Sequence, residues 1–294
     1  MAEQKFTGTG VAIVTPFRKD DSIDFKALEN LIEHLISNRV DYLVVLGTTG
    51  ETPTLSKKEK KAVTNFVKEA CAGRVPLVVG IGGNNTQEVV SQIKKTAFEG
   101  IDAVLSVAPY YNKPSQKGLY VHYSTIASFS PVPVIIYNVP GRTCSNITAE
   151  TTLKLAHDPN NNFAGIKEAS GNLLQIMKII QHKPDDFLVI SGDDAITLPM
   201  ISLGGSGVIS VVANAFPAEF SEMVRLALAN KFPEARKLHF ELLEIIEEIF
   251  VDGNPAGIKA ALNIMGLVQN HVRLPLSPVN RSTYNRLSEL IKKT

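Results

Sequence analysis

The chain has 294 residues, of which 44% are hydrophobic and 20% are charged, and its formal net charge is +1. This apolar content supports a large buried core and excludes a disordered chain. Lysine and arginine are scattered along a nearly neutral sequence, which excludes the concentrated positive charge of a nucleic-acid-binding protein. No apolar run approaches the roughly 18 residues that a membrane-spanning helix needs, so no membrane partner is expected.

Cysteines and histidines indicate neither disulfides nor a metal site. The chain has two cysteines, Cys71 and Cys144, which are too few for a disulfide framework and stand in no metal-binding pattern. None of the six histidines follows a predicted strand. The N-terminal segment lacks the apolar region of a signal peptide. We therefore expect a metal-free protein in the reducing cytoplasm.

Short β-branched runs alternate with longer amphipathic stretches along the chain. Eight nearly continuous apolar runs predict parallel strands that are buried on both faces, at residues 10–15, 42–47, 77–82, 103–108, 134–138, 163–167, 187–191 and 207–212. Amphipathic patterns predict a helix after each strand, at residues 25–38, 56–72, 86–98, 115–129, 148–156, 172–181, 194–202 and 217–229. Ser56 and Glu59 form a capping-box pattern at the start of the second helix.

Eight βα units fit either a closed barrel or an open doubly wound sheet. Their regular length, and the absence of a GxGxxG fingerprint after the first strand, favour an α/β fold of the closed (β/α)8 TIM-barrel type. We assign residues 1–230 to the catalytic barrel and residues 231–294 to a C-terminal extension. Three helices are predicted in this extension, at residues 242–250, 256–265 and 285–292, with packing or subunit contact as their expected role.

Barrel enzymes carry their active sites at the C-terminal ends of the strands. Lys167 ends the sixth predicted strand. A buried ammonium is costly, and a neutral amine in a dry pocket is the form that attacks a ketone carbonyl. The alternative is that Lys167 forms an ion pair with an acid such as Asp193 or Glu168.

The fifth strand ends at Tyr137, and Arg142 lies in the loop that follows it. Because the fifth and sixth strands are neighbours, the Tyr137 hydroxyl is expected within reach of the Lys167 amine, where a phenol can transfer protons. A core tyrosine bonded to a backbone carbonyl is the alternative. A guanidinium at position 142 suits a substrate carboxylate, and a surface ion pair is its alternative.

The second strand ends in Gly47-Thr48-Thr49-Gly50-Glu51. Glycines on each side of two hydroxyls predict a tight turn whose N–H and Oγ groups would bind a carboxylate. For Glu51 we favour a structural role, either capping the next helix or fixing the turn. Tyr110 and Tyr111 follow the fourth strand. Adjacent aromatics at a barrel rim often serve a subunit contact, and one of them could enter a site as a hydroxyl relay.

Three motifs together resemble the pyruvate-dependent class I lyase family. They are Gly47-Thr48-Thr49-Gly50-Glu51, Tyr137-Asn138-Val139-Pro140 with Arg142-Thr143, and Gly165-Ile166-Lys167-Glu168-Ala169. The resemblance covers essentially the whole chain. It is closest to the branch that condenses pyruvate with L-aspartate 4-semialdehyde to 4-hydroxy-tetrahydrodipicolinate, in lysine and diaminopimelate biosynthesis.

The resemblance implies that Lys167 forms an imine with pyruvate, and that no external cofactor is needed. Tyr137, Thr48 and Tyr111 would form a proton relay, with Tyr111 reaching in from a neighbouring subunit. Family members are commonly homotetramers built from tight dimers. The residues implied to bind the substrates are Thr49, Ile209 and Gly192 for pyruvate and Arg142 for the carboxylate of the semialdehyde.

Feedback-inhibited relatives bind free lysine at the tight-dimer interface. The positions that match this allosteric site are Thr52, Asn84, Glu88 and Tyr110. Lys57 and Lys60 stand where inhibited bacterial relatives carry histidines. Two ammonium groups beside a cationic ligand would repel it, so we expect weak or absent inhibition by lysine.

Two other functions stay open at this point. N-acetylneuraminate lyase, or another sugar-acid pyruvate aldolase, would share Lys167 and Tyr137 but usually lacks an arginine at the position of Arg142. A non-catalytic ligand-binding barrel would leave Lys167 ion-paired and would not need a proton relay.

Overall fold

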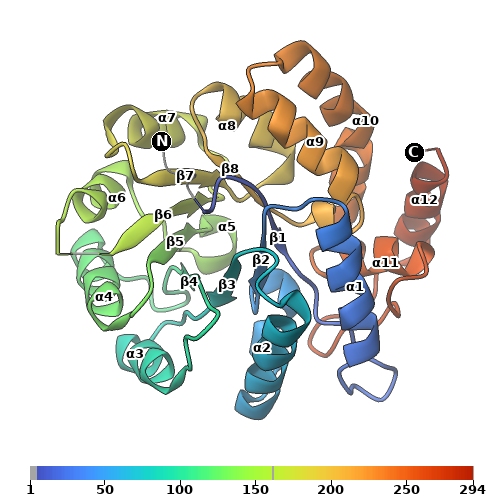
Figure 1. Cartoon of the computed structure of the whole chain (residues 1–294), viewed down its shortest axis with the longest axis horizontal. Helices are drawn as coiled ribbons and strands as arrows, with labels where there is room; N and C mark the ends of the chain where they lie inside the picture. Colours follow the sequence, from blue (N-terminus) through green and yellow to red (C-terminus); the bar gives the residue numbers. More distant parts are fainter. Residues whose placement is uncertain (1–4, 161, 294) are drawn as a thin grey trace.

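The computed structural model describes residues 5–160 and 162–293. Eight parallel strands follow one another around a closed barrel in chain order, and β1 pairs with β8 to close it (Figure 1). The strands are β1 Gly8–Ala12, β2 Tyr42–Val45, β3 Leu77–Gly80, β4 Ala103–Val107, β5 Val134–Asn138, β6 Phe163–Glu168, β7 Leu188–Ser191 and β8 Gly207–Ser210. The predicted α/β barrel is therefore confirmed.

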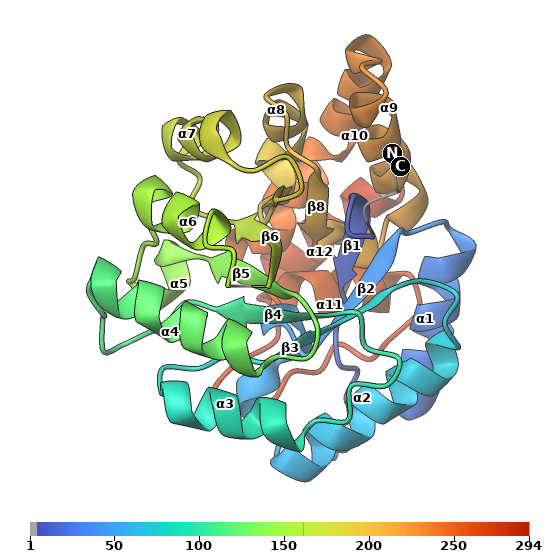
Figure 2. The ribbon, with the colours of Figure 1, turned by 60° about the vertical axis from the view of Figure 1, so that its left-hand side comes forward.

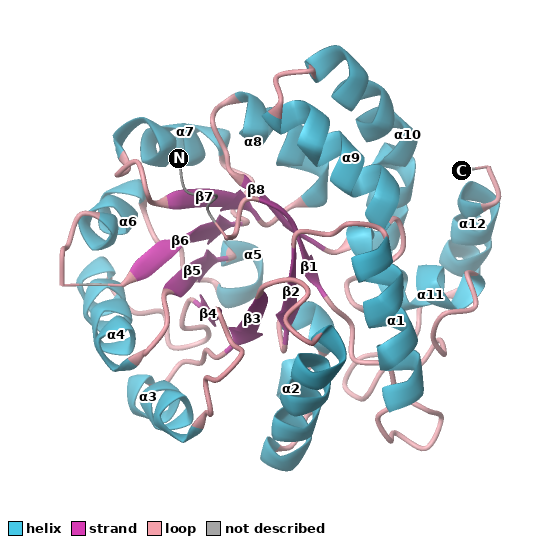
Figure 3. Cartoon of the chain, viewed as in Figure 1, coloured by secondary structure: helices cyan, strands magenta, loops and turns pink. Residues whose placement is uncertain are grey.

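Helices surround the ring of strands (Figure 3). They are α1 Phe25–Ser37, α2 Lys57–Cys71, α3 Thr86–Lys95, α4 Gln116–Phe129, α5 Pro140–Thr143, α6 Ala149–Ala156, α7 Leu173–His182, α8 Thr197–Ser202, α9 Pro217–Leu228, α10 Phe232–Val251, α11 Ala256–Ile264 and α12 Arg281–Ile291. The capping box at the start of α2 is present: Ser56 Oγ accepts from the Glu59 N–H, and the Glu59 carboxylate accepts from the Ser56 N–H. Within the described residues, no helix is both long and apolar enough to cross a membrane.

Four predictions of helix bounds were wrong by three residues or more. Two of these errors are small: α3 ends at Lys95 and not at 98, and α12 begins at Arg281 and not at 285, because Asn280 caps it. The other two involve a divided helix and a much longer one. The helix predicted at 194–202 divides into a 3-10 turn at Asp194–Ile196 and α8, because Asp193 caps the turn by accepting from the Ala195 N–H. The helix predicted at 242–250 begins at Phe232, because its N-terminal half buries Ala235 and His239. The resulting α10 packs along α9, as Figures 1 and 2 both show, and α12 packs against α10 and α11.

The strands separate the apolar interior of the barrel from the apolar layers outside it. One layer fills the barrel interior and includes Tyr42, Leu105, Ile135, Tyr137 and Ile209. The other layers lie between the strands and the surrounding helices. Because side chains alternate between the faces of a strand, Tyr137 points into the barrel and its successor Asn138 points toward the helices.

Candidate active site

Tyr137 and Lys167 lie side by side at the ends of β5 and β6. The parallel register pairs these two residues, and the Lys167 Nζ lies 4.4 Å from the centroid of the Tyr137 ring. Both are buried, with 6% of Tyr137 and 4% of Lys167 exposed. The Tyr137 hydroxyl forms no hydrogen bond to a backbone carbonyl within the described chain, so the alternative of a bonded core tyrosine is wrong. The site combines a buried amine with an adjacent phenol.

Neither acid considered as an ion-pair partner contacts the Lys167 amine. Glu168 accepts hydrogen bonds from the Asn138 amide at 3.1 and 3.2 Å and from the Ser170 N–H at 2.8 Å. The Asp193 carboxylate accepts from the Ala195 N–H at 3.0 Å. Lys167 forms no ion pair among the residues that the structure describes, which leaves its amine available for chemistry.

Gly192 follows β7 and leaves room for the Lys167 side chain. A Cβ added at this position would lie 2.7 Å from the Ala169 Cβ and 3.0 Å from the Lys167 Cε. Real Cβ atoms do not approach carbon so closely, so glycine is required here for packing. The Gly192 N–H donates to the Glu168 carbonyl at 2.8 Å, which fixes this loop to β6.

The turn after β2 presents two threonines, as predicted. Thr48–Gly50 forms a short 3-10 helix in which Thr49 is buried and Thr48 is half-buried. The Asn254 Nδ2 donates to the Thr49 Oγ1 at 3.0 Å. The Thr49 oxygen therefore accepts a hydrogen bond within the protein, and its own proton is free to be donated to a ligand.

Glu51 has the structural role that the sequence indicated. Its partner, Lys259, was not predicted from the sequence. The Glu51 side chain is fully buried in an ion pair with Lys259 of α11, and its second oxygen accepts from the Arg273 N–H at 3.0 Å. Burial lowers the pKa of Lys259 to about 8, against the opposing effect of Glu51. The C-terminal extension thus anchors the turn that carries Thr48 and Thr49.

Arg142 lies in α5, immediately beyond β5. One of its Nη atoms donates to the Asn254 carbonyl at 3.3 Å, and it forms no ion pair among the described residues. The alternative of a surface ion pair is therefore wrong. Asn254 contacts both Arg142 and Thr49, so a residue of the C-terminal extension joins two loops of the site.

Asp194 ties the end of β7 to the end of β8. Its Oδ2 accepts from the N–H groups of Val211 and Val212, at 3.0 Å each. The carboxylate is fully buried, and desolvation raises its pKa. These bonds hold the segment just beyond Ile209, whose side chain is buried inside the barrel. Asp194 and Asn254 were both missed by the sequence-based search for site residues.

Comparisons with known proteins identify the family of this chain. Residues 5–294 match the model of the dihydrodipicolinate synthetase family. The chain belongs to this family. Two similar proteins are both named 4-hydroxy-tetrahydrodipicolinate synthase. The one from Parabacteroides distasonis is 53% identical over 293 residues, covering 100% of this chain and 98% of the relative. The one from Flavobacterium psychrophilum is 56% identical over 290 residues, covering 99% of each.

Solved structures of this family have the same fold. The dihydrodipicolinate synthase of Aquifex aeolicus is 41% identical and superposes with a TM-score of 0.94 over 98% of each chain. That of Thermotoga maritima is 38% identical, with a TM-score of 0.95 over 98% of each chain.

The tyrosines that follow β4 are exposed in this member of the dihydrodipicolinate synthetase family. Tyr111 has 88% of its surface exposed and a left-handed φ of 72°, and Tyr110 is 43% exposed. The Tyr111 hydroxyl forms no hydrogen bond within the described part of the chain. A single chain therefore does not bring Tyr111 to Lys167 by a direct bond.

The residues expected to match a lysine site differ in their hydrogen-bond partners. Asn84 donates to the Tyr110 carbonyl at 3.2 Å, which joins two of them. Thr52 instead donates to the Leu46 and Gly47 carbonyls, at 2.5 and 2.9 Å, and so belongs to the turn after β2. Glu88 is exposed in the first turn of α3.

The two lysines at the start of α2 differ in their exposure. Lys57 is exposed and Lys60 is partly buried. Burial and, secondarily, the charge of Lys57 lower the pKa of Lys60. No bond connects either lysine to Asn84, Glu88 or Tyr110 within the described chain.

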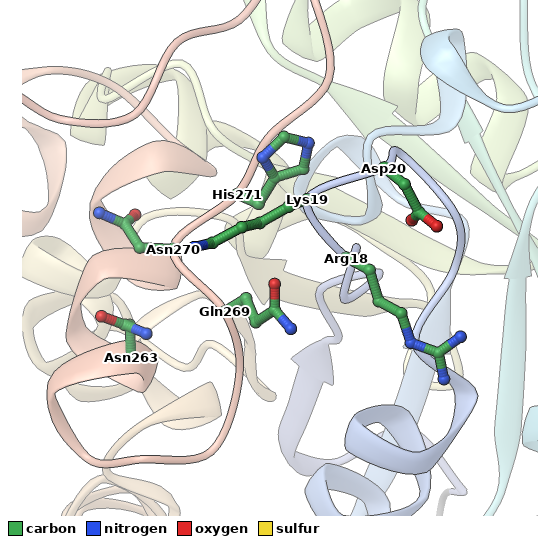
Figure 4. Close-up of a pocket in the computed structure, with 7 residues that line it drawn as sticks. All are labelled: Arg18, Lys19, Asp20, Asn263, Gln269, Asn270 and His271. Carbon is green, nitrogen blue, oxygen red and sulfur yellow. The ribbon is translucent and has the colours of Figure 1, made fainter.

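A hollow of about 680 Å³ has neither Lys167 nor Tyr137 in its lining, and Figure 4 shows the side chains that surround it. Several of its side chains are already bonded: His271 to Asp21 at 2.8 Å, and Asn263 to the Val268 carbonyl at 2.9 Å. Its lining is Arg18, Lys19, Asp20, Asn263, Gln269, Asn270 and His271. It contains neither the amine nor the phenol, so we do not assign the active site to it.

Proposed function

We propose that this chain condenses pyruvate with L-aspartate 4-semialdehyde to give 4-hydroxy-tetrahydrodipicolinate, a step of lysine and diaminopimelate biosynthesis. The observation that carries the proposal is the buried Lys167 amine beside Tyr137, in a chain of the dihydrodipicolinate synthetase family. The names of the similar proteins support this choice of substrates.

The chemistry requires a nucleophilic amine and a group that moves protons. Lys167 attacks the keto carbon of pyruvate, and loss of water from the carbinolamine gives the imine. The Tyr137 phenol delivers and removes the protons of these steps. Loss of a methyl proton gives an enamine, whose carbon attacks the aldehyde of the semialdehyde. The amine of this second substrate then closes the ring and releases Lys167.

The imine is itself the electron sink, so the proposal includes no external cofactor and no metal. A hydroxyl relay from Tyr137 through Thr48 to a neighbouring subunit's tyrosine at position 111 would connect the site to solvent. The high exposure of Tyr111 leaves its side chain available for that contact. A homotetramer of tight dimers belongs to the same proposal.

The substrate carboxylates require donors, and the loops around Lys167 supply them. Because the Thr49 oxygen accepts from Asn254, its hydroxyl proton can be donated to the pyruvate carboxylate. The exposed guanidinium of Arg142 suits the semialdehyde carboxylate. We assign pyruvate binding to Thr49, Gly192 and the backbone at Ile209, and semialdehyde binding to Arg142.

A cytoplasmic location belongs to the same proposal. Its support is that Cys71 and Cys144 are both free, with Cys71 buried and Cys144 exposed. Unpaired cysteines are typical of a reducing compartment.

Turnover by the purified protein tests the choice of substrates. Incubation with pyruvate and L-aspartate 4-semialdehyde should give a product with the mass of 4-hydroxy-tetrahydrodipicolinate, and Lys167→Ala should abolish it. The same preparation should leave N-acetylneuraminate uncleaved. Cleavage of that sugar acid without condensation would move the function to the sugar-acid aldolases, and neither reaction in folded protein would favour a binding barrel.

A further inference from the structure

Glu168 is a fully buried carboxylate that the reaction described above does not use. It follows Lys167 on β6, so its side chain lies on the opposite face of the strand, toward the helices. Its donors are the Asn138 amide at 3.1 and 3.2 Å, the Gln175 amide at 3.0 Å and the Ser170 N–H at 2.8 Å. No cation pairs with it among the described residues.

Asn138 directly follows Tyr137 on β5, just as Glu168 directly follows Lys167 on β6. The register of β5 and β6 pairs Tyr137 with Lys167 and Asn138 with Glu168. One side-chain bond therefore crosses from β5 to β6 immediately behind the catalytic pair. The backbone reinforces it, because the Ala169 N–H donates to the Asn138 carbonyl at 2.8 Å.

The same amide also holds the loop that carries Arg142. The Asn138 Oδ1 accepts from the Ile147 N–H at 3.0 Å, and its Nδ2 donates to the Asn146 Oδ1 at 2.9 Å. The Asn146 amide in turn donates to Gln175 of α7 at 2.9 Å. Residues 139–147, between these two anchors, include α5 and Arg142.

We propose that Glu168 is a positioning residue for the reaction, acting with Asn138 to hold the Tyr137 phenol against the Lys167 amine. A buried charge satisfied only by neutral donors is costly, and apolar side chains would fill the same space at lower cost. The polar cluster instead fixes the position of the end of β5 relative to the end of β6. The inference rests on the proposed function, since it requires Lys167 to form the imine.

The test is a double-mutant cycle on the rate constant of imine formation with pyruvate, measured by time-resolved borohydride trapping. Glu168→Gln retains the shape of the side chain and removes the charge that accepts all three donors. We expect it to slow trapping roughly tenfold to a hundredfold, a smaller loss than the roughly 10²- to 10⁴-fold that a positioned acid–base group itself contributes, because the phenol is displaced and not removed. If Glu168 acts through the phenol, Glu168→Gln should have little further effect in a Tyr137→Phe background.

A residue that only stabilises the fold would behave differently. Its substitution would lower the melting temperature, and its effect on the trapping rate would multiply with that of Tyr137→Phe. Ile166→Val is the matched control, because it removes one buried methyl beside Lys167 and leaves the polar cluster intact. It should lower the melting temperature with an unchanged trapping rate.

A second variant keeps the test decisive if Glu168→Gln does not fold. Gln175→Ala removes one donor from helix α7, outside the strand pair, and should give a smaller slowing that also disappears in the Tyr137→Phe background. Wild-type rates in both folded variants, or independent multiplicative effects, would overturn the inference. A wild-type protein that forms no adduct would instead overturn the proposed function, so the two failures are distinguishable.

Discussion

The Lys167 nitrogen lies 4.4 Å from the centre of the Tyr137 ring, and the two residues are partners in the register of β5 and β6. Adjacent barrel strands, rather than mobile loops, therefore set the distance between amine and phenol. Such a pair is positioned before substrate arrives, which lowers the cost of reaching the reactive geometry.

Removing the phenolic hydroxyl should slow the reaction without unfolding the protein. Tyr137→Phe retains the ring that packs in the barrel and removes the proton carrier. We expect kcat to fall by about 10²- to 10⁴-fold, as is usual for loss of a general acid–base group. Steady-state kinetics with a melting curve as the control would check this, and an unchanged kcat would remove Tyr137 from the mechanism.

Arg142 should matter for one substrate only. Arg142→Ala removes the guanidinium assigned to the semialdehyde carboxylate, a charged hydrogen bond worth about 1.5–3 kcal/mol. The KM for the semialdehyde should rise roughly tenfold to a hundredfold, while pyruvate still forms the imine at the wild-type rate. Arg142→Lys should recover part of the loss, because it retains charge but not the planar fork. Loss of pyruvate trapping in either variant would contradict the assignment.

Gly192→Ala should act on Lys167 by steric contact. The new Cβ would lie 3.0 Å from the Lys167 Cε and 2.7 Å from the Ala169 Cβ, so the amine must shift. We expect slower borohydride trapping with pyruvate and a stability loss of about 1–3 kcal/mol from overpacking. Denaturant unfolding and trapping kinetics measure the two effects, and a variant like wild type in both would show that the space is not needed.

Acid should destabilise the protein partly through His122. This side chain is 4% exposed, its Nδ1 is 2.8 Å from the Thr86 Oγ1, and burial lowers its pKa to about 4. The unfolded chain therefore binds more protons between the ordinary pKa of about 6.5 and the folded value, so the free energy of unfolding falls as pH decreases through this window. His122→Gln should remove part of that dependence. The check is denaturant unfolding of wild type and variant side by side at several pH values between 7 and 4. Equal losses of stability in the two proteins would contradict this prediction.

Free lysine should inhibit the enzyme weakly or not at all. The reason is the positive charge of Lys57 and Lys60 at positions where inhibited relatives carry histidine. Lys57→His with Lys60→His should increase sensitivity in a lysine titration of the initial rate. Strong inhibition of the wild-type enzyme at low lysine concentration would contradict the prediction.

The order of the strands and the functional residues at their ends were predictable from the sequence, because both depend on local patterns. Continuous apolar runs located all eight strands, and the end of the sixth identified Lys167. Five of the strands end one to three residues earlier than predicted, since apolar residues continue into the turns, whereas β6 ends one residue later. Leu46, for example, is buried just beyond β2 with a left-handed φ of 58°.

Contacts made by the C-terminal extension were not predictable in the same way. Asn254 reaches Thr49 across 205 residues of sequence, and Lys259 reaches Glu51 across 208. Neither asparagine nor lysine in these segments has a local pattern that distinguishes it from a surface residue. The packing of the C-terminal extension on the barrel brings them to the turn after β2, so only the tertiary structure reveals them.

Borohydride trapping with pyruvate, followed by peptide mass spectrometry, tests the central claim most directly. We predict a reduced pyruvate adduct on the peptide that contains Lys167, with no adduct on other lysines and none in Lys167→Ala. An adduct on a different lysine, or none from folded protein, would contradict imine chemistry at this residue and leave Lys167 with a structural role.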